Sequence, residues 1–272
     1  MKTIDPPVNE LDLRAEAVLD PAIQFTNPLS ENIANPQAIF LTGATGFLGV
    51  YLLDEILHKT TADVYCLIRA KDPEDGKQRL KKQLEFYSLW DEKLSYRIIP
   101  VVGDLAKPRL GITEEQFKEL GDRIDVIYHN GAMVNYVCPY NTLKDSNVRG
   151  TEEVLRLASL IQTKPVHFVS SISVFFSPAH PIDREVLESD TPQFHHNMKG
   201  GYKQSKWVAE KLVTIAQKRG LPAAIYRPVR IMGHSKTGIT GNFNDLLCGL
   251  LKGCVQLGRF PASDAADDTP CV

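Results

Sequence analysis

The chain has 272 residues, of which 43% are hydrophobic and 24% are charged, and its net charge is −2. This composition is typical of a globular protein and excludes a disordered or collagen-like chain. The near balance of acidic and basic residues disfavours a protein that binds duplex DNA by neutralising phosphates. The longest apolar runs have the length of a strand, so we expect no membrane span.

The N-terminus and the cysteines favour a cytoplasmic, reducing compartment. Residues 1–13 lack the apolar stretch of a secretory signal. The five cysteines are odd in number and none forms a CxxC pair, so neither a disulfide framework nor a zinc site is expected. The adjacent His195 and His196 also lack the spacing of metal ligands. We therefore predict no metal.

From residue 37 onward, strand-like and helix-like patterns alternate. The hydrophobic pattern predicts strands at 38–42, 63–68, 97–103, 124–130, 166–171 and 221–228. It predicts helices at 46–60, 73–89, 114–120, 140–162, 201–220 and near 242–254. The strands are apolar without strict alternation, as in a sheet covered on both faces. Together they predict an α/β fold with a Rossmann-type, doubly wound parallel sheet.

The sequence divides into three segments. Residues 1–36 contain five prolines and a short helical pattern at 11–19, which indicates a lead-in lying over the next domain or a linker. Residues 37–232 carry the alternating pattern and form the predicted dinucleotide-binding domain. Residues 233–272 end in loop-like sequence, which indicates a C-terminal segment that is cut short.

A glycine motif follows the first predicted strand and opens the first predicted helix. Its sequence is Gly43-Ala44-Thr45-Gly46-Phe47-Leu48-Gly49. Glycines allow a sharp turn and a close approach to a pyrophosphate, and the start of a helix offers free N–H groups. The spacing is GxxGxxG rather than GxGxxG, which favours one branch of the dinucleotide-binding folds.

The end of the second strand distinguishes between the two nicotinamide cofactors. An NAD enzyme usually carries Asp or Glu about 20 residues beyond the glycine motif. Arg69 stands at that place in this sequence. A guanidinium can pair with a 2′-phosphate and stack on adenine, so we predict NADP(H).

Two further strand ends carry weaker signals. Gly103-Asp104-Leu105 suits the adenine amino group, although Gly-Asp is also a common turn. The small residues of His129-Asn130-Gly131-Ala132 let the backbone pass close to the nicotinamide ribose. Asn147 on the next helix is counted with the cofactor residues; it holds the backbone after strand four or a water, or it lies on the helix surface.

A candidate catalytic group follows the fifth strand. Tyr202 and Lys206 form a YxxxK pattern that places both on one face of a helix. A neighbouring ammonium and a cationic nicotinamide lower the pKa of a phenol, normally about 10, and make it a proton donor or acceptor. Among Ser170, Ser171 and Ser173, alternation along a strand puts Ser171 and Ser173 on one face. Ser171 is our choice to hold the substrate oxygen.

These motifs resemble the extended short-chain dehydrogenase/reductase superfamily. More narrowly, the chain resembles the thioester reductase domains that terminate nonribosomal peptide and polyketide synthases, and their relatives in carboxylic acid reductases and α-aminoadipate reductase. The resemblance extends from about residue 11 to the end of the chain. Eight blocks in family order carry it: IFLTGATGFLGVYLLDEIL, VYCLIRA, VVGDLAKPRLGI, DVIYHNGAMVNYVCPY, NVRGTEEVLRLA, FVSSISV, GYKQSKWVAE and YRPVRIMGHSKTG.

The resemblance implies a role for each motif. The pyrophosphate would lie on the glycine motif, and the other contacts would follow the order of the strand ends. The catalytic triad would be Ser171, Tyr202 and Lys206, where the family often has Thr in place of the serine. The implied cofactor residues are Gly43, Thr45, Gly46, Phe47, Leu48 and Gly49 for the pyrophosphate, Arg69 and Arg79 for the 2′-phosphate, Asp104 and Leu105 for adenine, Asn130, Gly131 and Ala132 for the nicotinamide ribose, and Pro228 and Val229 over the nicotinamide.

The resemblance also implies a reaction. NADPH would reduce an acyl or peptidyl thioester, held on the phosphopantetheine arm of a carrier protein, to an aldehyde, and a second hydride transfer would give the alcohol. Tyr202 and Ser171 would neutralise the oxyanion, while Lys206 would hold the ribose and lower the phenol pKa. Residues 233–272 would be the first part of a substrate-binding subdomain. The protein would act as a monomer or as part of a multidomain synthase.

Three alternatives share parts of this pattern. A fatty acyl-CoA reductase would take CoA thioesters and associate with membrane. A nucleotide-sugar epimerase or dehydratase would use NAD, against which Arg69 argues. A domain that releases its product by cyclisation, without redox chemistry, would lack the active tyrosine, against which Tyr202 argues.

Overall fold

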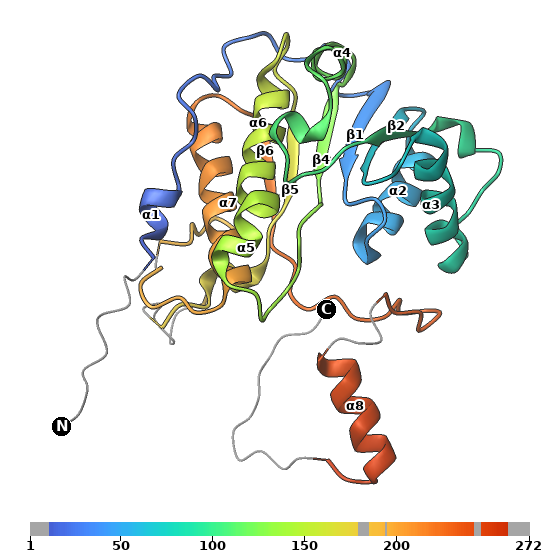
Figure 1. The fold of residues 1–272 in the computed structure, drawn as a ribbon, viewed down its shortest axis with the longest axis vertical. Helices are drawn as coiled ribbons and strands as arrows, with labels where there is room; N and C mark the ends of the chain where they lie inside the picture. The colour runs from blue at the N-terminus through green and yellow to red at the C-terminus, as the bar shows by residue number, and fades with distance from the viewer. Residues whose placement is uncertain (1–10, 179–184, 194, 242–245, 261–272) are drawn as a thin grey trace.

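One six-stranded parallel sheet organises the part of the chain that the computed structural model describes, residues 11–178, 185–193, 195–241 and 246–260. Its order is β3-β2-β1-β4-β5-β6 (Figure 1), which confirms the predicted Rossmann-type fold. The strand order reverses between β1 and β4, and ligands of such sheets bind at the carboxyl edge of this reversal. The strands are β1 (Ala38–Thr42), β2 (Asp63–Ile68), β3 (Ile98–Val102), β4 (Val126–His129), β5 (Val166–Val169) and β6 (Ala223–Tyr226).

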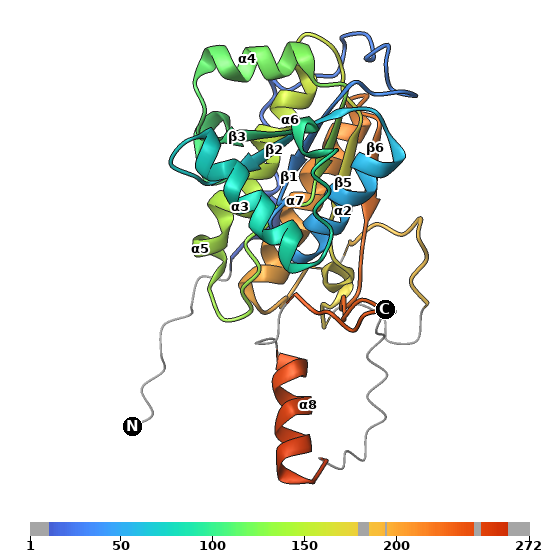
Figure 2. The same cartoon turned by 90° about the vertical axis from the view of Figure 1, so that its right-hand side faces the viewer.

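Helices cover both faces of the sheet (Figures 1 and 2). The α2 and α3 helices pack on one face, and α4, α6 and α7 pack on the other. Neighbouring side chains of one strand therefore enter different layers: Phe40 belongs to one apolar cluster, and Ile39 and Leu41 to the other. The helices are α1 (Leu13–Glu16), α2 (Phe47–Lys59), α3 (Pro73–Phe86), α4 (Glu114–Arg123), α5 (Tyr140–Lys144), α6 (Gly150–Ser159), α7 (Gly201–Lys218) and α8 (Leu246–Leu257).

The predicted helix over 140–162 is helical without a break from Tyr140 to Ser159, so only its last three residues are wrong. It contains a π-helical turn, Asp145–Arg149, between α5 and α6. The residue Ile161, with φ of +61°, has left-handed backbone that cannot continue a helix. Short π-helical segments frequently occur at functional sites, and this one carries Asn147.

The lead-in packs on the domain as part of its core. Leu13, Leu19 and Ile23 are each at most 2% exposed and join the apolar cluster that contains α7. Arg219, just after α7, donates hydrogen bonds to the backbone carbonyls of Leu19, Asp20 and Ile23. In Figure 1 this blue segment runs along α7 before it reaches β1. Residues 11–36 thus stabilise the helix layer on that face.

The segment after β6 crosses the carboxyl edge of the sheet toward α2 (Figure 1). His234 stacks on the ring of Tyr51 at a centroid distance of 5.6 Å. A Cβ atom at Gly241 would lie 2.4 Å from the Cβ of Phe47.

The α8 helix lies beyond this edge in both views, with Val255 and Leu257 exposed. The predicted starting residues of that helix, 242–245, lie outside the described residues, as do Cys271 and the rest of 261–272. Among the helices of the described part, none is long and apolar enough to cross a membrane.

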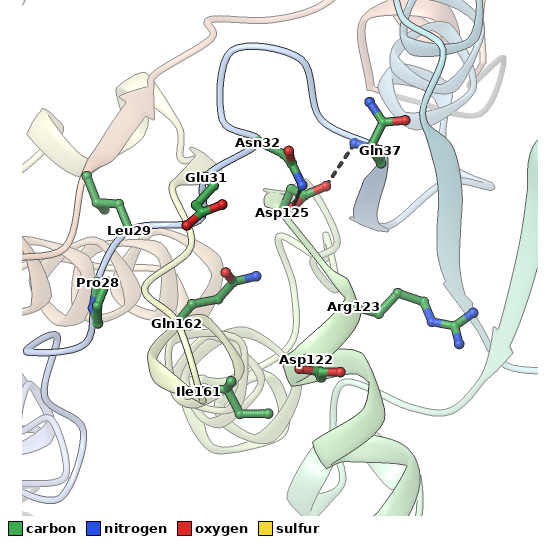
Figure 3. A pocket seen from close by; sticks show the side chains of 10 residues that line it. All are labelled: Pro28, Leu29, Glu31, Asn32, Gln37, Asp122, Arg123, Asp125, Ile161 and Gln162. Carbon is green, nitrogen blue, oxygen red and sulfur yellow. Dashed lines mark hydrogen bonds between the residues drawn. The ribbon is translucent and has the colours of Figure 1, made fainter.

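Asp125 anchors the opposite, amino edge of the sheet. Its carboxylate accepts hydrogen bonds from Ser30 Oγ at 2.8 Å and from the backbone N–H groups of Gln37 and Ala38 at 2.8 and 3.0 Å. The side chain lies beside an open hollow of about 510 Å³ that is formed by segments preceding the strands (Figure 3). Burial raises the pKa of Asp125, but these hydrogen bonds outweigh it and hold the pKa below its usual 3.8.

The substitution Asp125→Ala is expected to lower the free energy of unfolding by roughly 3 kcal/mol, because it leaves several buried donors without an acceptor. Urea denaturation at neutral pH measures this, and the exposed neighbour Asp122→Ala serves as the control with little change. Since the folded pKa is lowered, the stabilisation by Asp125 is complete above the unfolded pKa of about 4 and is lost as the pH falls below it. Equal destabilisation by both variants would contradict the anchoring role.

Candidate active site

The glycine motif forms a cradle that admits no side chains. Gly43 has φ of +75°, and a Cβ atom there would lie 2.7 Å from the Cα of Gly131. A Cβ atom on Gly49 would lie 1.9 Å from the carbonyl oxygen of Gly43. The N-cap of α2 is Gly46, which offers no side-chain oxygen to the first amides of the helix. The motif thus combines a glycine turn with the start of a helix, the arrangement that binds the pyrophosphate of a dinucleotide in this fold class.

A directed chain of hydrogen bonds fixes the Gly131 side of this cradle. The N–H of Gly131 donates to Thr42 Oγ1 at 2.9 Å, and Thr42 Oγ1 lies 2.8 Å from His129 Nδ1. His129 Nε2 lies 3.0 Å from Thr151 Oγ1, which donates to the carbonyl of Asn147. Because Thr151 already donates its hydroxyl proton to Asn147, it accepts from His129, which places the ring proton on Nε2. Nδ1 then accepts from the hydroxyl of Thr42. Burial lowers the pKa of His129 to about 3, so the ring is neutral at neutral pH.

The side chain of Asn147 is buried and joins two elements of the site. It accepts from the N–H of Met133 at 2.7 Å and donates to the carbonyl of Met133 at 3.0 Å and to Ser205 Oγ at 2.9 Å. Of the roles that the sequence left open, the structure shows contact with the backbone after β4. The polar atoms of Asn147 are thus engaged by protein groups, and it acts on the site as a positioning residue.

The basic residues after β2 separate into two groups. Arg69 and Arg79 are exposed at the carboxyl edge, where the guanidinium of Arg79 donates to the carbonyl of Arg69. Lys77 instead donates to the backbone carbonyls of Ser95 and Ile98. Two guanidinium groups therefore remain at the edge where the adenosine end of a cofactor would lie.

The loop after β3 approaches the same edge. Asp104 Oδ1 accepts a hydrogen bond from the backbone N–H of Ala106 at 3.0 Å, as in a turn. Leu105 packs against Gly131, where a Cβ atom would lie 2.7 Å from Leu105 Cδ1. The structure thus brings Leu105 to the glycine cradle, while the role of Asp104 toward adenine stays a prediction.

The α7 helix carries the YxxxK pair into the carboxyl edge. Lys206 is 3% exposed, its Nζ donates to the carbonyl of Val169 at 2.6 Å, and it lies 4.4 Å from the ring centroid of Phe168. Burial lowers the pKa of Lys206 to about 7, and the charge of Glu210 partly opposes this shift. The lysine is therefore held at the end of β5, one helical turn from Tyr202.

The lowered pKa expected for Tyr202 in the presence of a nicotinamide stays a prediction, and the protein without cofactor shows the opposite shift. Burial, with a smaller contribution from Tyr136, raises the pKa of Tyr202 above its usual 10. The ammonium of Lys206 bonds the carbonyl of Val169 instead. Burial thus makes the Tyr202 phenol a weaker acid than a free tyrosine while no nicotinamide is bound.

The three candidate serines have different surroundings. Ser170 is buried and donates to the carboxylate of Glu210. Ser171 is half-buried and caps the 3₁₀ turn Ile172–Phe175, with its Oγ 2.9 Å from Ser173 Oγ. The predicted strand 166–171 is two residues too long, because β5 ends at Val169, so alternation along a strand does not explain why Ser171 and Ser173 are close. Ser171 and Ser173 meet through the turn that follows the strand.

A buried ion pair, which the sequence analysis missed, joins the three segments that carry the site. Glu210 is 0% exposed and accepts from Arg227 Nε and Nη2 at 3.1 and 2.9 Å, as well as from Ser170. The next residue, Pro228, accepts at its carbonyl from the N–H of Ile172 at 3.1 Å. The ends of β5 and β6 are thereby bound to α7. The only signal in the sequence is the spacing of Glu210, one turn beyond Lys206.

The sequence model of an NAD-binding family described as "Male sterility protein" matches residues 41–271. A linear gramicidin synthase of Brevibacillus parabrevis is 48% identical over 261 residues, which are 96% of this chain and 5% of that protein. The chain therefore spans about one twentieth of this relative.

Solved structures agree with the sequence comparison. The terminal R domain of the myxalamid PKS-NRPS biosynthetic pathway superposes with a TM-score of 0.86 and 47% identity, over 93% of this chain and 64% of that one. A thiolation-reductase di-domain from an archaeal nonribosomal peptide synthetase superposes with a TM-score of 0.68 and 25% identity, over 92% of this chain and 53% of that one. The chain thus spans a little more than half to just under two thirds of these structures.

The substitution Glu210→Ala is expected to lower the free energy of unfolding by about 3 kcal/mol, because it removes the buried acceptor of Ser170 and the carboxylate partner of Arg227, whose side chain is only 14% exposed. Chemical denaturation measures the effect. The matched control is Glu114→Ala, which removes an exposed carboxylate paired with Lys118 and should change little. A small, similar effect of both variants would mean that the buried pair does not hold the site together.

Proposed function

Because this chain belongs to the NAD-binding family described as "Male sterility protein", we propose that it uses NADPH to reduce a carrier-bound thioester to an aldehyde. One observation carries the proposal: the glycine cradle and the α7 face bearing Tyr202 and Lys206 meet at the same edge of the sheet. Such an edge holds a dinucleotide in this fold class. The similarity of the chain to a peptide synthetase and to a terminal R domain supports a carrier-bound thioester as the substrate class.

The cradle and the loops beside it would hold the cofactor. The backbone around Gly43 and the start of α2 would bind the pyrophosphate, and Arg69 and Arg79 would bind the 2′-phosphate. Lys206 has its ammonium at the end of β5, where it would reach the nicotinamide ribose. When bound, the reduced nicotinamide supplies a hydride.

The remaining chemistry belongs to the side chains at the end of β5. Ser171 Oγ and the phenol of Tyr202 would hold the thioester oxygen and draw its growing negative charge. Tyr202 would then donate its proton to that oxygen, and the charge of Lys206, one helical turn away, would help the phenol to release it. Collapse of the resulting hemithioacetal would release the aldehyde and the carrier thiol.

The carrier is proposed from the relatives. The R domain of the myxalamid pathway is terminal in a PKS-NRPS pathway, and the archaeal relative joins a thiolation domain to its reductase domain. We therefore propose a phosphopantetheine-bearing carrier protein as the partner. A CoA thioester and a nucleotide sugar remain outcomes of the assay below.

The experiment that tests the function is reduction of an acyl-pantetheine thioester, with aldehyde detected as a hydrazone. Wild-type protein with NADPH should form aldehyde, and Tyr202→Phe should lose at least 100-fold in kcat, because it removes the proton donor and keeps the ring. The NADPH affinity of Tyr202→Phe should stay that of the wild type. Turnover of a CoA thioester or a nucleotide sugar, but not of the pantetheine thioester, would replace the proposed substrate.

Cofactor choice has its own test. Arg69→Ala should raise the Kd for NADPH by about 10- to 100-fold, because it removes a charge-assisted contact to the 2′-phosphate. The Kd for NADH should not change, since NADH has no such phosphate. Lys82→Ala, on the exposed face of α3, is the matched control. Equal binding of both cofactors to the wild type would contradict the NADPH assignment.

A further inference from the structure

An uncharged loop with apolar side chains projects beside the candidate proton donor. We call residues 133–137, between β4 and α5, the apolar loop; its sequence is MVNYV. The side chains of Val134, Tyr136 and Val137 are 60%, 72% and 94% exposed, and Met133 is also exposed. Neighbouring apolar side chains that face water commonly mark a place where something binds.

Hydrogen bonds and close contacts hold both ends of this loop. Asn147 binds both backbone groups of Met133, at 2.7 and 3.0 Å. Asn135 Oδ1 accepts from the N–H groups of Val137 and Cys138, both at 2.9 Å. At Gly201, the first residue of α7, a Cβ atom would lie 2.5 Å from the backbone between Cys138 and Tyr140. The exposed side chains are therefore presented from a base that is fixed to the catalytic helix.

Tyr136 connects the apolar loop to the reaction centre. Its ring meets the ring of Tyr202 edge to face, with centroids 5.4 Å apart and planes at 68°. Tyr136 stays 72% exposed, while Tyr202 is 9% exposed. The ring of Tyr136 thus separates Tyr202 from water and offers its remaining surface to whatever lies against the phenol. Phe176, just after the turn capped by Ser171, is exposed near the same end of α7, with Lys203 Nζ 5.6 Å from its ring centroid.

We propose that the apolar loop binds the acyl chain of the thioester, with Tyr136 as the specificity-determining contact. This inference rests on the proposed function, and it names the substrate class as acyl groups that are apolar beyond the carbonyl. Because the rings of Tyr136 and Tyr202 are in contact, carbons next to a carbonyl held by Tyr202 would come within reach of Tyr136. A charged acyl chain would lose hydration against Val134 and Val137 without gaining a partner from the apolar loop, because the loop carries no charge.

The proposal predicts a chain-length effect that a structural role would not produce. Tyr136→Ala should lower kcat/KM for an octanoyl-pantetheine thioester by about 10- to 100-fold, mainly through KM, because several methylene contacts are lost. For the acetyl thioester the change should stay within about threefold, since acetyl has one carbon to lose contact. Tyr136→Phe keeps the ring and should resemble the wild type. Val137→Asp should weaken octanoyl turnover and leave NADPH affinity unchanged.

A matched control separates this effect from a general one. Tyr96 is 74% exposed in the 3₁₀ turn that precedes β3, at the opposite edge of the sheet. Tyr96→Ala should change neither the octanoyl nor the acetyl rate. Equal losses for octanoyl and acetyl in Tyr136→Ala would overturn the proposal, and so would a wild-type preference for a succinyl over an octanoyl thioester.

A binding measurement distinguishes failure of this inference from failure of the proposed function. Calorimetry with the amide analogue of octanoyl-pantetheine, at saturating NADPH, needs no turnover. Weaker binding of the analogue to Tyr136→Ala than to the wild type supports the inference, even if no thioester is reduced and the proposed function is wrong. Equal binding to both proteins overturns the inference, even if the wild type forms aldehyde and the proposed function holds.

Discussion

The close approach of the Gly43 and Gly131 backbones determines where every other part of the site lies. The two residues follow β1 and β4, which are neighbours in the sheet because its strand order reverses between them. A side chain at either position would push the strand ends apart. The chain from Gly131 through Thr42, His129 and Thr151 holds this approach with buried polar groups. A neutral, fully bonded imidazole holds it without a buried charge.

The same polar chain reaches α7, the helix that carries the candidate proton donor Tyr202. Thr151 donates to the backbone of Asn147, the Asn147 side chain donates to Ser205, and Ser205 donates to the carbonyl of Tyr202. The π-helical turn displaces the backbone around Asn147 from a regular helix, and Asn147 there binds both Met133 and α7. On the far side of α7, Glu210 binds the ends of β5 and β6. The candidate acid is thus held from two sides by groups that are themselves buried.

The two edges of the sheet have separate tasks. At the amino edge, Asp125 ties the lead-in to β1 and serves stability. At the carboxyl edge lie the glycine turns, the exposed guanidinium groups and the apolar loop on which the proposed function rests. Parallel strands bring their carboxyl ends together, so residues far apart in the chain converge there, while the amino edge is free to carry anchoring contacts.

The sequence by itself determined the fold class, the six strands and the motifs that end them. Apolar runs and glycine spacing report local backbone preference and burial, and these depend on near neighbours in the chain. Only the tertiary structure decided the surroundings of each motif. It showed that Asn147 binds Met133 and Ser205, and that Ser170 binds Glu210 while Ser171 contacts Ser173. It also revealed the contacts of Glu210 with Arg227 and of Tyr136 with Tyr202. Each of these depends on distances between segments that are separated in sequence, and on how far packing removes a group from water. Neither quantity is contained in the local pattern of residues.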